Sequence, residues 1–327
     1  MGGLRQLEPK IEYPAAAGHP LRPPLRPPPF PVPPEKKEVQ EAAVFELRVF
    51  EEVKKYLGAD EASAFEKLAL PYLQAKPRMT EFPYDDIGKD LELVKEREEE
   101  AMKNNSLEQK LNYVRVKTFE ALLSTIMELH WMPGAFITET SDYDDWKNGA
   151  DAVLEWGAFK TVIDFTCQKD KGKLHEKLQR VFLKIDRGDM SSVKYFRSQA
   201  DKRKHALIRL PVVIVGLSAA TVRELLKLYV AGKKKELENH WAKSAIAEEI
   251  LAQIKKFKEY INNEKRTGYN QTEAQKMSSS YSRLEIEISK MLDKKAPQEG
   301  EPEIADEEKQ KRPDGVYQML MVTMAAD

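Results

Sequence analysis

Gly149-Ala-Asp-Ala-Val-Leu-Glu-Trp-Gly-Ala-Phe-Lys-Thr-Val-Ile-Asp-Phe-Thr166 is the stretch of this 327-residue chain that decides its fold. It predicts two short strands joined by a tight turn at Gly157-Ala158. Each predicted strand carries an aspartate, Asp151 at the start of the first and Asp164 near the end of the second. A carboxylate in an apolar run costs stability unless something binds it, so these two acids are the first candidates for a functional site.

The turn also predicts how the two aspartates lie. With a two-residue turn at Gly157-Ala158, residues whose numbers sum to 315 face each other, and Asp151 and Asp164 meet this condition. Like charges so placed repel, which calls for a cation or another partner. Two carboxylates, a neighbouring backbone carbonyl and waters make an oxygen shell that suits Mg²⁺. The alternative is structural: backbone donors satisfy Asp151, and Asp164 forms an ion pair with a lysine or arginine.

Composition narrows the class of protein. Charged residues make up 33% and hydrophobic residues 41%, and the formal net charge is −1, so any attraction to nucleic acid must be local. The single cysteine, Cys167, excludes an internal disulfide and a cysteine-based zinc site, and the five histidines are scattered. The apolar runs are too short to span a bilayer, and Met1 to Gln6 lack a secretory pattern. We therefore expect a cytoplasmic protein that does not associate with membranes.

The first third of the chain divides into an arm and a helical region. Residues 1–34 are rich in proline and predict an extended, disordered arm. Its PxxP spacing indicates either a ligand for an SH3-like groove on a protein partner or a stiff linker. Residues 35–104 predict helices, one of them stopped by Pro71 and a highly charged one at about 86–104.

Residues 105–265 predict an α/β core. A capping box at Ser106 begins a helix that continues to about His130. The remaining elements expected there are a strand at 136–140, a polar loop at 141–149, the two strands already described, a helix at 173–187, a strand at 206–215, and helices at 219–230 and 236–263. Residues 266–327 predict a weak helix at about 273–292 and an acidic disordered tail.

This element order and the Asp…Asp-x-Thr hairpin resemble the PD-(D/E)xK nuclease superfamily. The resemblance covers about 125 residues, rests on a short motif, and implies a restriction-endonuclease-like αβββαβα core with a small mixed sheet and N- and C-terminal helical extensions. It matches Asp151 and Asp164 to metal-binding catalytic acids, with Mg²⁺ as cofactor, and Glu120 to a helical acid; Glu128 is a weaker match. Thr166 takes the place of the family's lysine and lacks its charge. A base from another position, such as Lys160, Lys169 or Lys171, would have to substitute, or the site is weak or inactive.

A basic block follows the hairpin. Residues 168–204 hold twelve lysines and arginines against five acids. Either they neutralise nucleic-acid phosphates, with Tyr195 and Phe196 stacking on bases, or they form a solvated helix face. The expected nucleic-acid contacts are Lys169, Lys171, Lys173, Lys177, Arg180, Lys202, Arg203 and Lys204.

Three functions follow from these observations. The first is a Mg²⁺-dependent nuclease-like protein that hydrolyses DNA or RNA with Asp151 and Asp164. The second is a catalytically inactive protein on the same fold that serves as a nucleic-acid or protein binding module or scaffold. The third is a purely helical interaction protein, which requires that the hairpin prediction be wrong. The oligomeric state stays open; the resemblance makes a dimer one expectation.

Overall fold

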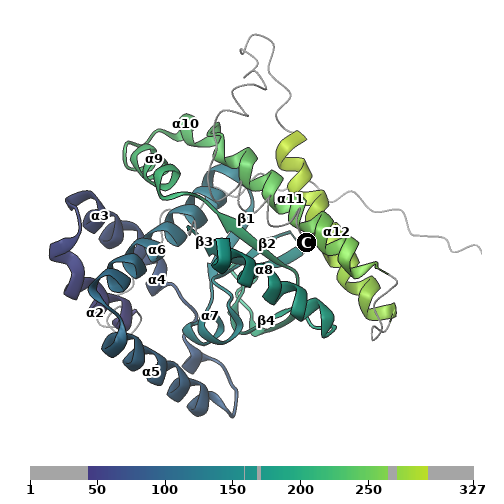
Figure 1. Cartoon of the computed structure of the whole chain (residues 1–327), viewed down its shortest axis with the longest axis horizontal. Helices are drawn as coiled ribbons and strands as arrows, with labels where there is room; N and C mark the ends of the chain where they lie inside the picture. Colours follow the sequence, from purple (N-terminus) through teal and green to yellow (C-terminus); the bar gives the residue numbers. More distant parts are fainter. Residues whose placement is uncertain (1–42, 158, 168–170, 264–270, 294–327) are drawn as a thin grey trace, which may run out of the picture. The chain divides into compact units, whose positions relative to one another are not determined.

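Four strands form the central sheet, in the order β1-β2-β3-β6, and the first three of them are labelled in Figure 1. They are β1 (Ala135–Glu139), β2 (Ala152–Trp156), β3 (Phe159–Thr166) and β6 (Val212–Gly216). β2 runs antiparallel to both β1 and β3, whereas β3 and β6 are parallel. The chain is therefore a mixed α/β protein with a small mixed sheet, and the purely helical alternative is wrong.

The computed structural model describes residues 43–157, 159–167, 171–263 and 271–293. The expected proline-rich arm, the start of the helical region before residue 43, Lys169 and the acidic tail lie outside these ranges. Within them, no helix has both the length and the apolar character needed to cross a bilayer.

The register of the central hairpin is the predicted one. Ala152 faces Ile163 and Trp156 faces Phe159, so the numbers of each pair sum to 315. Gly157 adopts a φ of 60°, which glycine reaches without the steric cost that a Cβ brings. Asp151 and Asp164 come one step beyond the Ala152–Ile163 pair, at the same end of the hairpin.

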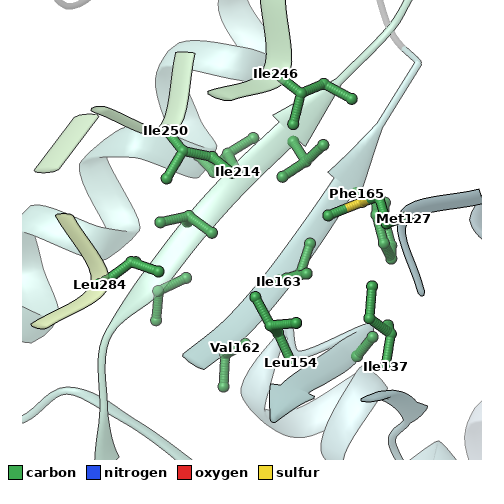
Figure 2. Packing of buried hydrophobic residues seen from close by; sticks show 14 of the residues in the cluster. Met127, Ile137, Leu154, Val162, Ile163, Phe165, Ile214, Ile246, Ile250 and Leu284 are labelled. Carbon is green, nitrogen blue, oxygen red and sulfur yellow. The ribbon is translucent and has the colours of Figure 1, made fainter. Parts of the chain in front are cut away.

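Two C-terminal helices cover part of the sheet. α11 (Ala242–Ile261) and α12 (Gln271–Asp293) pack against each other, α11 also against β6 and α12 against β3. Figure 2 shows Ile246 and Ile250 of α11 beside Ile214 of β6. Burying one such aliphatic side chain contributes about 1.5–3 kcal/mol. The expected weak helix, α12, is thus part of the main core, to which it contributes Met277, Tyr281, Leu284, Ile288 and Met291.

The helix that leads into the sheet starts at the predicted capping box. α6 (Leu107–Ile126) begins after Ser106, whose Oγ accepts the N–H of Gln109 at 3.2 Å. Gln109 Oε1 accepts the N–H of Ser106 in return at 2.7 Å. The π-helical turn η4 (Met127–Trp131) continues the helix to the predicted end near His130.

The N-terminal helical region differs from prediction at Pro71. The helix does not stop there, because α3 (Ala59–Ala64), the π-helical turn η2 (Phe65–Ala69) and α4 (Leu70–Gln74) follow without a break. Pro71 lies in the first turn of α4, where a missing N–H is tolerated, and η2 changes the hydrogen-bonding pattern just before it. The other elements of this region are α2 (Val44–Val53), η1 (Lys54–Tyr56), η3 (Met79–Glu81) and the predicted charged helix α5 (Ile87–Asn104).

The predicted polar loop at 141–149 is wrong, because this segment contains the helix α7 (Asp142–Asn148). Ser141 is its N-cap, with Oγ accepting the N–H of Asp144 at 3.2 Å. The positive end of the helix dipole stabilises the three acids in the first turn of α7. Gly149 ends the helix with a φ of 61°.

The single strand predicted at 206–215 is also wrong. Pro211 divides it into β5 (Lys204–Leu210) and β6, which belong to different sheets. β5 pairs antiparallel with β4 (Ser191–Arg197), a strand that lies inside the basic block and was not predicted. Proline has no N–H to donate, although the Pro211 carbonyl still accepts the N–H of Val162 at 2.9 Å.

Of the three remaining helices predicted in the core, the structure confirms two and divides the third. α8 (Lys171–Asp186) and α9 (Ala219–Val230) are confirmed. The helix predicted at 236–263 is broken, since α10 (Lys234–Glu238) ends before α11 begins at Ala242. The observed order from α6 onward is α6, β1, α7, β2, β3, α8, β4, β5, β6, α9, which adds one helix and one hairpin to the predicted core.

Candidate active site

Asp151 lies between the ends of β1 and β3. Its N–H donates to the carbonyl of Ile163 at 3.2 Å, and its own carbonyl accepts the N–H of Thr140 at 3.1 Å. Its Oδ2 accepts the N–H of Phe165 at 2.7 Å. The carboxyl group is therefore held against β3, and a backbone donor accounts for one of its two oxygens.

Asp164 is bound by a lysine from the helix that follows β3. Lys177 of α8 donates to Asp164 Oδ1, and also to the carbonyl of Phe165 at 2.9 Å. The side chains of Lys177 and Asp164 are 22% and 14% exposed, so water screens this ion pair only weakly. Burial lowers the pKa of Lys177, but the carboxylates of Asp164 and Asp151 raise it overall.

Glu120 is buried inside α6, with 3% of its surface exposed, so it is not a surface acid. Its Oε2 accepts from Lys117 Nζ at 2.8 Å, and the same ammonium donates to Asp145 Oδ2 of α7 at 3.0 Å. Burial raises the pKa of Glu120, which Lys117 opposes and Asp145 reinforces. The unpredicted helix α7 thus brings a further acid to the site.

Six of the charged side chains described above form one electrostatic cluster, which is named the carboxylate cluster. It comprises four carboxylates and two ammonium groups: Glu120, Asp145, Asp151, Asp164, Lys117 and Lys177. Within these six groups the acids outnumber the lysines, and Lys76 adds a positive charge that acts on Glu120 and Asp145. Burial, together with the neighbouring carboxylates, raises the pKa of Glu120 and of Asp151.

Asp151 is strongly affected by this excess of acids. Burial is the main reason why its pKa is well above the usual range, and the carboxylates of Glu120, Asp164 and Asp145 raise it further. Burial also acts on Asp145, but Lys117, Lys76 and a hydrogen bond with Asp151 lower the pKa of Asp145 overall. These opposite shifts favour a proton on Asp151 rather than on Asp145.

The expected substitutes for the motif lysine are not the ones found at the site. Thr166 is buried, and its carbonyl accepts the N–H of Leu217 at 3.2 Å. Lys160 pairs with Glu155 at 3.2 Å. The Lys171 side chain and Lys169 fall outside the part of the chain that is described. Lys177, expected only as a phosphate contact, is the lysine that touches Asp164.

Glu128, the weaker match for the helical acid, has another role. Its Oε2 accepts the N–H of Ile137 at 3.1 Å, which ties η4 to β1. Burial raises the pKa of this carboxyl, and the hydrogen bond opposes that shift. Glu120 is therefore the helical acid that belongs to the carboxylate cluster.

Several residues of the basic block neutralise acids of the same chain. Lys204 pairs with Glu81 at 2.7 Å, and Arg203 approaches Asp201 of its own loop at 3.5 Å. Lys202 donates to Gln199 Oε1 at 3.0 Å. These pairings favour a structural role for the 202–204 part of the block.

The expectation that Tyr195 and Phe196 stack on bases is wrong. Both lie on β4, and only 0% and 1% of their surfaces are exposed. The Tyr195 hydroxyl donates to Asp90 of α5 at 2.7 Å. These rings pack inside the protein and cannot meet a base without local unfolding.

Two expected phosphate contacts on α8 are exposed. Lys173 and Arg180 flank Lys177 at helical spacings of four and three residues, so the three share one face. The Arg180 guanidinium lies beside Gly149, because a Cβ added at this glycine would be 3.8 Å from Arg180 Nη1. This places the guanidinium next to the end of α7 and the start of β2. Lys173 and Arg180 remain candidates for phosphate contacts beside the carboxylate cluster.

The donor atoms at the end of the hairpin are of the chemical type that a hard divalent cation binds. Asp151, Asp164 and the Phe165 carbonyl offer only oxygen, which Mg²⁺ prefers. Over the described ranges, no three histidine, cysteine, aspartate or glutamate side chains form a group that would hold a metal ion. The candidate set thus relies on two carboxylates and one carbonyl, and the Lys177 ammonium already bridges two of these three groups.

Sequence patterns did not reveal the roles of Lys177, Lys117 and Asp145. Lys177 lies thirteen positions after Asp164, and only the path from β3 into α8 brings the two together. The sequence offered one indication that Lys177 could reach the site, because this lysine borders the apolar stripe of α8 next to Leu174 and Leu178.

Comparison of the chain with protein-family models, curated proteins and solved structures found no match.

Proposed function

We propose that this chain is a nuclease-like protein that hydrolyses phosphodiester bonds of nucleic acid with a divalent metal. In this proposal, Asp151, Asp164 and the Phe165 carbonyl hold the metal, and Glu120 is the helical acid. A bound Mg²⁺ would activate water and neutralise charge on the phosphodiester in its transition state. The order of α6, the β1-β2-β3 meander, α8 and β6 is compatible with a restriction-endonuclease-like core into which α7 and the β4–β5 hairpin are inserted.

The observation that carries this proposal is the contact of Lys177 with Asp164, an ion pair that the structural alternative also predicts. It provides a partly buried positive charge beside the second aspartate, where Thr166 provides none. In the nuclease, the Lys177 ammonium would stabilise negative charge that develops on the scissile phosphate. Lys173 and Arg180, exposed on the same helix face, would hold neighbouring phosphates.

A cleavage assay with the full chain tests the proposal. Labelled single-stranded DNA, duplex DNA and RNA are incubated with the protein in Mg²⁺, in Mn²⁺ and in EDTA. We expect Asp164→Asn to lose more than about 100-fold of the metal-dependent rate, since losing even an outer-shell partner of a metal ligand costs about 10–100-fold. Asp189→Asn, which changes an exposed acid just beyond α8, is the matched control and should retain the wild-type rate.

The assay also decides between the nuclease and the inactive alternative. If wild-type protein cleaves none of these substrates with either metal, the enzymatic proposal is wrong. Binding of the same nucleic acids that survives Asp164→Asn would then identify the chain as a binding module on this fold. Cleavage that proceeds equally in EDTA would exclude a metal role for the two aspartates.

A further inference from the structure

The Lys177 ammonium lies where two of the expected metal ligands meet. It contacts Asp164 Oδ1 and lies 2.9 Å from the Phe165 carbonyl. These are two of the three groups that would bind a divalent cation in the proposed nuclease. An ammonium nitrogen that holds both oxygens uses lone pairs that a metal ion would need.

The surroundings of Lys177 favour this position. The ammonium contacts Asp164 directly, and both Asp164 and Asp151 attract it. On the other side of the cluster, Lys117 is occupied by Glu120 and Asp145. The side chain of Lys177 is 22% exposed, so it has a route to solvent as well as a place in the site.

We propose that Lys177 is a resident cation of the Asp151–Asp164 site and that a divalent metal must displace its ammonium to bind there. The inference rests on the proposed function only for the identity of the metal ligands. It assigns Lys177 a second state, in which the ammonium has left Asp164 Oδ1 and the Phe165 carbonyl. In that state the side chain is available to contact a phosphate at the same site.

The exchange makes metal binding at this site depend on the release of Lys177. While the Lys177 ammonium holds the two oxygens, it neutralises the Asp164 carboxylate without a metal, which limits the free-energy cost of burying that charge. A metal gains only the difference between its own binding and that of the ammonium, so the wild-type affinity is reduced by competition. Removing the ammonium while keeping the apolar stem should therefore tighten metal binding.

Calorimetric titration of Mn²⁺ into the full chain, without nucleic acid, tests this expectation. Lys177→Met should bind Mn²⁺ at least about tenfold more tightly than wild type, because a competing unit charge has been removed from within the ligand shell. Lys147→Met, which removes an exposed lysine of the adjacent helix α7, is the control for the general effect of charge and should stay near the wild-type affinity. Equal or weaker binding by Lys177→Met, or no binding by either protein, overturns the inference.

A measurement on the wild-type protein keeps the test valid if Lys177→Met fails to fold. Acetylation of surface lysines followed by peptide mass spectrometry reports how accessible each ammonium is. We expect the modified fraction of Lys177 to rise when Mn²⁺ is added, because the metal releases the side chain. An unchanged fraction at a Mn²⁺ concentration that saturates the calorimetric signal shows that metal and lysine do not compete.

The cleavage assay separates this inference from the nuclease proposal. Tighter Mn²⁺ binding by Lys177→Met, without cleavage by wild type, supports the exchange and contradicts the nuclease. Metal-dependent cleavage by wild type, with unchanged Mn²⁺ affinity in Lys177→Met, supports the nuclease and contradicts the exchange.

Discussion

Two groups of charged side chains in this protein have the same ratio of two acids to each lysine but differ in burial, since Glu120 of the first group is 4% exposed and Asp86 of the second is 58% exposed. At the carboxylate cluster, four acids surround two lysines. At Lys194 of β4, one ammonium donates to Asp86 and Asp90, at 2.6 Å in each case. The rings of Tyr84, Tyr143 and Tyr195 surround the same ammonium, with centroids 5.4–5.8 Å from its nitrogen, and the arrangement is named the Lys194 cage below.

The pKa shifts follow from this difference. In the Lys194 cage, a hydrogen bond from Lys194 lowers the pKa of Asp86, and the hydrogen bonds to Asp86 and Asp90 raise the pKa of Lys194 although burial opposes this. In the carboxylate cluster the pKa of Asp151 is raised instead. A structural ion pair favours the charged form of both partners, whereas burial among other carboxylates disfavours the charged form of Asp151.

The largest expected effect comes from removing one of the two lysines of the carboxylate cluster, in which acids already outnumber lysines. Lys117→Met should lower the free energy of unfolding by about 3–5 kcal/mol, because Glu120 and Asp145 lose the partner that they share. Urea unfolding at pH 7 measures this change. Lys147→Met is the control and should stay within about 0.5 kcal/mol of wild type; a Lys117→Met protein as stable as this control would show that Glu120 and Asp145 simply take up protons.

A pH-dependent effect is expected at Glu139, a buried acid of β1 close to Lys76 and Lys117. Burial raises its pKa from 4.5 to about 8, although the two lysines oppose this. The stability that its protonated form provides is complete below pH 4.5 and is lost as the pH rises toward 8. Glu139→Gln removes this loss, so its stability relative to wild type should rise by roughly 1.4 kcal/mol per pH unit at most within that window.

Unfolding curves of wild type and Glu139→Gln at pH 5, 6, 7 and 8 test this prediction. The difference between the two proteins should grow steadily in favour of the variant. A difference that stays constant across the series would mean that Glu139 is ionised throughout, with Lys76, 3.3 Å from Oε1, as its counter-ion.

The smallest expected effects are the most direct test of the comparison, because they differ in sign. Asp151→Asn keeps an acceptor for the Phe165 N–H and a donor for Asp145, and removes an acid that resists ionisation. It should stabilise the protein by about 1 kcal/mol at pH 7, as functional-site substitutions often do. Asp90→Asn weakens charge-assisted bonds from Lys194 and should destabilise it by about 1–2 kcal/mol.

Thermal unfolding of both variants at pH 7 provides the measurement. Shifts of the same sign would contradict the distinction between the two groups of charges. Stabilisation by Asp151→Asn together with loss of metal binding would identify Asp151 as an acid retained for function at the expense of stability.

Local patterns predicted those elements that depend on nearby residues. The hairpin register follows from the two-residue turn, since side chains alternate with a fixed period along each strand. The capping box at Ser106 and the apolar stripes of α8 and α9 are equally local. Two of the failed predictions involve exceptions to a local rule: Pro71 is tolerated after a π-helical turn, and Pro211 separates two strands of different sheets.

The amino-acid sequence by itself determined the hairpin, its register and the meeting of Asp151 and Asp164 at one end, because a tight turn and a strict alternation leave only one way to pair the strands. Only the tertiary structure decided what surrounds the two acids. Lys177 comes from α8, Glu120 and Lys117 from α6, and Asp145 from α7. Residues so far apart in the chain meet only through packing, which is why the charge balance of this site cannot be read from the spacing of its motif.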